Sequence, residues 1–255
     1  MAVTTLNTGD RFRIGRVLND SFAVIRRNPV LCLGLGVLLY AAPRFAFSLW
    51  YVQATAGSAG AAPQSFFSQH AMLAIAGVLL YVGVIAILQT SLIRAAIVDR
   101  RGEKPSLADC LGVAFTLFFP VLLTSLVVTL AIMLGLILLV VPGILLLLRW
   151  AVAIPVLIQE RPNILDSMAR SRDLTKGNRW ALLGLWLTLI GGGTLVGLVA
   201  TRIAMPLNVN FGLIVDSLGK AAVTVLSSVA SAVSYVELRQ VKEGTGVDEL
   251  AEIFS

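Results

Sequence analysis

The chain has 255 residues, of which 57% are hydrophobic and only 13% are charged, and its formal net charge is +6. A soluble domain of this length would have too few polar side chains to cover its surface, so the composition excludes an ordinary water-soluble protein. The Lys and Arg residues are dispersed and accompany no aromatic-lined basic module, so the positive charge does not indicate nucleic-acid binding.

The charged residues are grouped along the chain. Twenty-nine of the 34 charged side chains fall into segments 1–28, 94–109, 160–179 and 237–255, which hold 16 of the 20 Lys and Arg. Segment 51–70, by contrast, carries no charge. Short loops rich in Lys and Arg stay in the cytoplasm during membrane insertion. The pattern therefore predicts a multi-pass protein with both termini cytoplasmic and an even number of crossings.

The apolar stretches between these segments have the length of membrane-spanning helices. A hydrocarbon core of roughly 30 Å takes about 20 helical residues, and backbone groups in lipid must be satisfied within the helix. From Cys110 to Gln159 the only charge is Arg149, and two crossings fit there if the chain turns at Pro142–Gly143. The chain is thus predicted to be an all-α integral membrane protein with six transmembrane helices, at about 29–50, 71–93, 117–140, 144–159, 180–201 and 211–236.

A short pattern precedes each odd-numbered crossing: an apolar residue, any residue, Asp, then Ser or Cys, then an apolar residue. It occurs at 18–22, 107–111 and 164–168. The first copy lies in an amphipathic stretch typical of a helix at the membrane interface. We therefore predict a single membrane domain built of three repeats, each an interfacial helix plus a transmembrane hairpin, over about 11–99, 105–160 and 162–240. Residues 241–255 form a cytoplasmic tail.

One segment of the chain resembles a known family. The run Ala169–Trp180 (ARSRDLTKGNRW), followed by an apolar helix, is similar to the signature of the bacterial glycerophosphoryl diester phosphodiesterase membrane-domain family, and 235–239 and 243–250 are similar to its end. The resemblance implies a six-helix module of the bacterial inner membrane. It does not imply hydrolysis, because in that family the phosphodiesterase is a separate soluble domain for which this chain has no room.

No catalytic or metal-binding motif is present in the sequence. It contains no HExxH, no Cys/His metal spacing, no GxSxG and no phosphate-binding glycine loop. The one histidine, His70, lies in a Gln/Ser/Ala-rich loop without acid/base partners. We therefore expect a protein that is not an enzyme and has no cofactor or metal. A Ser or Thr nucleophile leaves a membrane-lipid-modifying enzyme as a third alternative.

Five charged residues lie outside the four charged segments, and the predicted topology places all of them in the outer half of the membrane: Arg44, Arg149, Arg202, Asp216 and Lys220. One interpretation is that the long basic side chains snorkel to the headgroups. The other is a net positive outer cavity that binds a lipid phosphate or another anion. In that second interpretation Arg149 faces the bundle and shares the site with Arg44 or Lys220. The simpler alternative for Asp216 and Lys220, one helical turn apart, is that they pair with each other.

A second candidate site is the cytoplasmic motif Arg170, Arg172, Lys176, Arg179 and Trp180, which combines basic charge with an interfacial aromatic residue. It suits docking of a partner or a lipid headgroup, or simple anchoring.

The predicted function is a non-enzymatic inner-membrane protein that binds membrane lipids or serves as a scaffold for a membrane-protein partner. The alternative is a transporter or channel for a small anionic solute or lipid, suggested by the outer bases and by Gly191–Gly193 in the fifth crossing. The sequence predicts no oligomeric state and no ligand identity.

Overall fold

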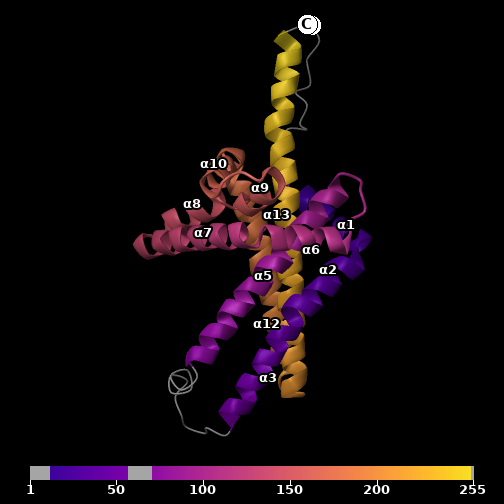
Figure 1. The fold of residues 1–255 in the computed structure, drawn as a ribbon, viewed down its shortest axis with the longest axis vertical. Helices are drawn as coiled ribbons and strands as arrows, with labels where there is room; N and C mark the ends of the chain where they lie inside the picture. The colour runs from indigo at the N-terminus through magenta and orange to yellow at the C-terminus, as the bar shows by residue number, and fades with distance from the viewer. Residues whose placement is uncertain (1–11, 57–70, 254–255) are drawn as a thin grey trace.

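The computed structural model describes residues 12–56 and 71–253, and every regular element in them is helical (Figure 1). Six stretches are long and apolar enough to cross a membrane, which confirms the predicted all-α membrane class. The elements are α1 (Ile14–Arg27), α2 (Pro29–Gly36), the π-helix η1 (Val37–Ala41), α3 (Ala42–Ala56), α5 (Ala71–Arg100), α6 (Leu107–Thr116), α7 (Phe118–Leu138), α8 (Val140–Arg149), α9 (Ala153–Glu160), α10 (Ile164–Thr175), α11 (Arg179–Trp186), the π-helix η2 (Leu187–Gly192), α12 (Gly193–Ala204) and α13 (Val209–Ile253).

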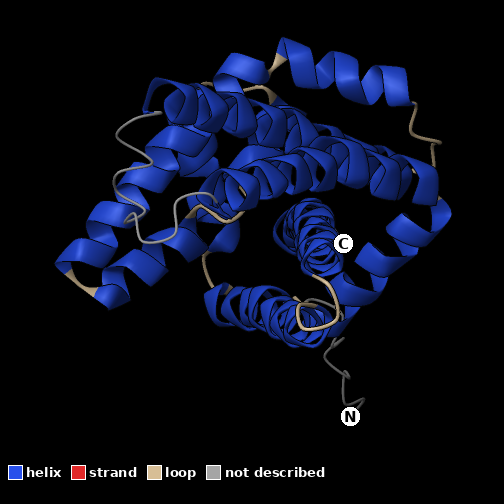
Figure 2. Cartoon of the chain, turned by 90° about the horizontal axis from the view of Figure 1, so that it is seen from below, coloured by secondary structure: helices blue, strands red, loops and turns tan. Residues whose placement is uncertain are grey.

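The longest helix, α13, lies at the centre of the molecule. It packs against α1, α5 and α12 and is seen nearly end-on among the other helices in Figure 2. Its 45 residues extend for about 67 Å at 1.5 Å per residue, far more than a bilayer core. The helix therefore continues without a break past the predicted end of the sixth crossing at about 236 and on to Ile253, and the cytoplasmic tail at 241–255 stays a prediction.

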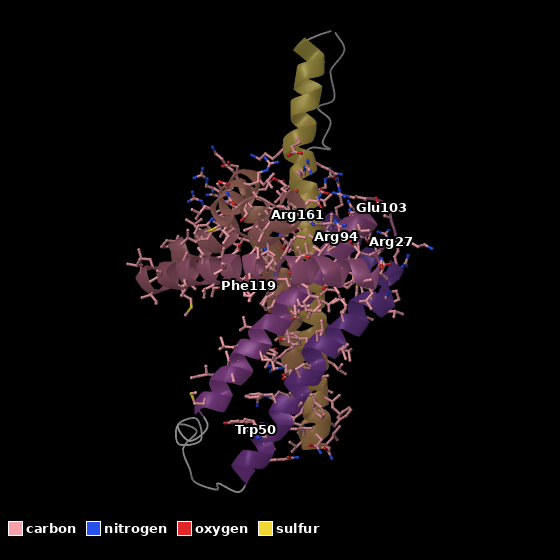
Figure 3. All side chains as sticks on the ribbon, viewed as in Figure 1. Arg27, Trp50, Arg94, Glu103, Phe119 and Arg161 are labelled. Atoms are coloured by element: carbon pink, nitrogen blue, oxygen red, sulfur yellow. The ribbon has the colours of Figure 1, made fainter. Side chains whose placement is uncertain are left out.

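The two ends of the bundle differ in their charge. The labelled Arg27, Arg94, Glu103 and Arg161 lie around the half from which the C-terminal part of α13 projects, whereas Trp50 lies at the opposite end (Figure 3). We call the first the charged end. All four charged segments, separated widely in the sequence, contribute residues to this end, because Glu237 and Glu243 of the fourth segment bind Arg16 and Arg170.

The repeated Asp-Ser/Cys pattern has a consistent structural role. The small residue of each copy, Ser21, Cys110 and Ser167, is fully buried. Two of the aspartates bind arginines of α5. Asp20 accepts a hydrogen bond from Arg100 at 2.7 Å, which joins α1 to α5. Asp109 accepts one from Arg94 at 3.0 Å, which joins α6 to α5. The aspartate of the third copy, Asp166, accepts instead from the nearby Asn163 at 3.4 Å. The threefold repeat itself stays a prediction.

The hairpin of α7 and α8 runs crosswise to α13 and projects from the bundle (Figure 1). Its turn was wrongly predicted at Pro142–Gly143, because the helix breaks at Leu139, which has extended backbone. Pro142 instead lies in the first turn of α8, where a proline needs no backbone donor. Gly143 lets the two helices approach closely: a Cβ there would lie 2.7 Å from the backbone nitrogen of Leu136.

The predicted fourth crossing is broken in the middle, between α8 and α9. The carbonyls freed by this break are bound by hydroxyls of other helices. Arg149 O accepts from Ser171 Oγ at 3.0 Å, and Ala151 O accepts from Ser231 Oγ at 3.2 Å. The break is therefore held by α10 and α13, and it turns the chain from the projecting hairpin back into the core.

Two crossings contain a π-helical segment at similar places. Each of η1 and η2 follows an eight-residue α-helix, α2 or α11, and each contacts α13. The glycine triplet Gly191–Gly193 lies at the end of η2 and the start of α12, so the chain there is a wider helix and is not unwound. Nothing in the sequence indicated the matching segment at Val37–Ala41.

Candidate functional site

Three of the five predicted outer-half charges form one network at the junction of α3 and α13. Arg44 Nη2 lies 2.9 Å from Asp216 Oδ2, and Lys220 Nζ lies 2.7 Å from Asp216 Oδ1. The carboxylate is thus shared between a guanidinium from another helix and an ammonium one turn along α13. Because two positive side chains share one negative one, the network keeps a net charge of +1.

The network is only partly buried within the protein. The side chains of Arg44 and Asp216 are 29% and 22% exposed, and that of Lys220 is 48% exposed. An ion pair at this level stabilises the contact between α3 and α13, because each charge would be costly alone in lipid. The predicted pairing of Asp216 with Lys220 is confirmed.

An apolar groove of about 500 Å³ lies beside this network, between α3 and α5. Its volume is in the range of small-molecule sites. Phe47, Val78 and Leu80 in its walls are 50%, 59% and 71% exposed, so the walls face the surroundings of the bundle, which in a membrane are acyl chains. The groove is lined by Pro43, Arg44, Phe47 and Trp50 of α3 and by Gly77, Val78, Leu80, Tyr81 and Val84 of α5.

Sequence reasoning singled out Arg44 but missed the other groove residues. On each helix they recur at i, i+3 or i+4, and i+7, which is one helical face. Phe47 and Trp50 pack with ring centroids 5.7 Å apart. This helical spacing is present in the sequence. In a helix that is apolar all round, however, the groove residues cannot be told from residues that face lipid.

The structure does not bring Arg149 to this network, contrary to the prediction. Its carbonyl is bound by Ser171 and lies 3.4 Å from Thr175 Oγ1, so the residue sits beside α10. Its Nε is buried and has no hydrogen-bond partner among the described residues. Arg202 is exposed near the end of α12 and forms no ion pair in the described part of the chain. The prediction was wrong because the helix breaks after Arg149 and the chain changes direction there. Counting about 20 apolar residues per crossing does not reveal such a break.

The residues of the predicted cytoplasmic motif differ in their contacts, and Arg170 is the one that bridges other helices. Arg170 binds Glu160 at 3.3 Å and also binds Glu243 of α13. Burial lowers the pKa of the Arg170 guanidinium, but its hydrogen bonds and attraction to these two carboxylates outweigh burial and raise the pKa overall. This residue therefore fastens α10 to α9 and α13.

The other residues of the cytoplasmic motif do not take part in this network. Among the described residues Arg172 pairs with its neighbour Asp173 alone, and Lys176 is exposed. Arg179 begins α11 with its Nε buried and without a hydrogen-bond partner in 12–56 and 71–253, while Trp180 is 83% exposed. An exposed tryptophan suits an anchor at a membrane interface.

Within residues 12–56 and 71–253, no group of three or more His, Cys, Asp or Glu side chains is arranged to hold a metal ion. His70 lies outside the described residues.

Comparison of the chain with protein-family models, with curated proteins and with solved structures finds no match. The described residues form a helical membrane protein with a lateral apolar groove beside a partly buried ion network.

Proposed function

We propose that this chain is a non-enzymatic membrane protein that binds a phospholipid in the groove between α3 and α5. The observation that carries the proposal is the apolar groove, in which Arg44 is the one charged residue among the described lining residues and belongs to a network of net charge +1. Apolar walls favour an acyl chain, and the net positive charge favours an anionic headgroup. Asp216 is seven residues from the start of α13, about 10 Å along the helix, within reach of a headgroup for a long basic side chain.

The proposed location is the bacterial inner membrane with both termini cytoplasmic, so that the charged end faces the cytoplasm and the groove opens into the outer leaflet. The positive charge of the loops and the family resemblance support this orientation. Reporter fusions after Ser58 and Gly244 should report outside and inside, respectively, and the same side for both would contradict it. The proposal also includes a role for this chain as a scaffold for a membrane-protein partner of the envelope.

Lipid binding is tested by filling the groove. Gly77 lines it, and a Cβ at Gly77 would meet nothing within 4 Å, so Gly77→Trp should fill the groove without disturbing the helices. Gly34 on α2 has the same open surroundings and does not line the groove, which makes Gly34→Trp the matched control. Native mass spectrometry from nanodiscs and crosslinking with a photoreactive acyl chain are the readouts. Loss of bound lipid and of crosslinks at Phe47 is expected in Gly77→Trp alone. Equal lipid retention in both variants would refute the proposal.

The preference for anionic lipid is tested separately. Lys220→Gln removes the net charge but leaves Asp216 paired with Arg44, so no carboxylate is stranded. We expect the preference for phosphatidylglycerol over phosphatidylcholine to fall, while total lipid occupancy is kept. Arg202→Gln, which removes an exposed base on the neighbouring α12, is the control and should keep the preference.

Transport of an anionic solute or lipid is the second candidate, favoured by the two π-helical segments that contact α13. Such segments occur frequently at functional sites, where they mark a local departure from regular packing. Solute flux in proteoliposomes is the direct measurement. Flux of a small anion together with unchanged lipid retention in Gly77→Trp would favour transport over lipid binding.

A further inference from the structure

We infer that the charged end holds a second ligand site, a cavity that binds a phosphate ester. The cavity has a volume of about 460 Å³ and lies between the ends of α5 and α9 and the side of α13. It lies at the opposite end of the bundle from the groove between α3 and α5 and shares no lining residue with it. The inference therefore does not rest on the proposed function.

Arginines dominate the charge of the cavity. Arg100 lies at the end of α5, Arg101 just beyond it and Arg239 on α13. Glu243 is the one acidic residue among the described lining residues. Three positive charges and one negative charge leave a net charge of +2. A planar guanidinium can donate two parallel N–H bonds to two oxygens of a tetrahedral phosphate, which a lysine ammonium cannot do, so an arginine-lined cavity favours a phosphate over a simple anion.

Two of these arginines are held in place by carboxylates. Arg100 Nη1 donates to Asp20 at 2.7 Å, and Arg239 Nε donates to Glu243 Oε2 at 2.6 Å. Glu243 is also bound by Arg170, which reduces its repulsion of an anion. Each guanidinium has five N–H donors, so a single ion pair leaves donors for a ligand.

Arg101 differs from the other two arginines. It forms no ion pair with any residue of the described part of the chain and is exposed just beyond α5. A base that lines a cavity without a carboxylate partner contributes its full charge to a ligand. Replacing Arg101 should also affect the fold least, because no carboxylate loses an ion-pair partner.

A neutral amide indicates a further feature of the ligand. Gln159 lines the cavity from the end of α9, and its Oε1 is buried without a hydrogen-bond partner among the described residues. A buried acceptor without a donor is unfavourable, and a ligand hydroxyl would satisfy it. Tyr235 does not fill this role, because its hydroxyl donates to Glu160 at 2.9 Å. The favoured ligand is thus a phosphate ester that carries a hydroxyl group, either a phospholipid headgroup or a soluble compound.

The experiment has two arms that separate these sources. The full chain is placed in phosphatidylcholine nanodiscs, and its thermal stability is measured with ribose 5-phosphate, with ribose as the control. In the second arm phosphatidylglycerol replaces part of the phosphatidylcholine. Stabilisation by ribose 5-phosphate alone identifies a soluble ligand, and stabilisation by phosphatidylglycerol alone identifies a headgroup. No stabilisation in either arm overturns the inference.

Two variants assign any stabilisation to the cavity. Arg101→Gln should weaken the apparent affinity about tenfold, the loss of one charge-assisted contact, without changing stability in the absence of ligand. Lys104→Gln, three residues away and outside the cavity, should change the apparent affinity little. Equal effects of both variants would overturn the inference. If Gly77→Trp removes the phosphatidylglycerol effect and Arg101→Gln does not, the effect belongs to the groove, and the cavity is overturned while lipid binding in the groove stands.

Discussion

The contact between α1 and α13 contains a buried carboxylate with one partner. Glu237 is 1% exposed, and Arg16 Nη1 lies 3.1 Å from its Oε1. The distance is that of an ion pair, but the alignment falls short of a hydrogen bond, and neither oxygen of Glu237 accepts one from any described residue. We predict that Arg16→Leu destabilises the protein and that adding Glu237→Leu restores most of the loss.

The magnitude follows from the burial of the two side chains. Removing one partner of a fully buried pair costs about 3–5 kcal/mol, because the remaining charge stays buried and unpaired. The Arg16 side chain is 42% exposed, so solvent screens the pair, and we expect a loss of roughly 2 kcal/mol. Glu237→Leu alone removes the buried charge and leaves an exposed arginine, so its cost should stay below about 1 kcal/mol.

The assay is unfolding in mixed micelles by increasing SDS, followed by the fluorescence of the tryptophans, for the wild type, both single variants and the double variant. Arg172→Leu is the control, since Arg172 pairs with the exposed Asp173, and this variant should lose less than about 0.5 kcal/mol. An Arg16→Leu variant as stable as Arg172→Leu would refute the reasoning. Additive losses in the double variant would do so as well, because they would show that the two residues do not interact.

Three further predictions concern the hairpin, the helix break and a thiol. Gly143→Ala should destabilise the α7–α8 hairpin by about 1–3 kcal/mol, because the new methyl meets backbone, whereas Gly34→Ala has open space and should not; equal melting temperatures would contradict the close approach. Ser171→Ala should cost about 1–2 kcal/mol in the same unfolding assay, since it removes a donor to the Arg149 carbonyl, and an unchanged midpoint would show that the break does not need it. Burial raises the pKa of the Cys110 thiol to about 11, so it should react with maleimide at pH 7.5 far more slowly in the folded protein than in SDS, and equal rates would contradict the burial.

Much of the architecture was predictable from the sequence. The lengths of the apolar stretches and the positions of charged residues are properties of single segments, and they predicted the six spans and the pairing of Asp216 with Lys220 one turn away. These follow from local periodicity and from the thickness of a bilayer, which act on each segment regardless of its neighbours.

Tertiary structure alone decided which segments meet. Arg44 reaches Asp216 across 172 positions of sequence, and the break after Arg149 moves that residue to α10 and away from the network. The sequence did not predict the direction of the α7–α8 hairpin either. A helix that is apolar all round has no polar face to show which side contacts protein and which contacts lipid, so its hydrophobic pattern predicts that it enters the membrane and not how it packs there.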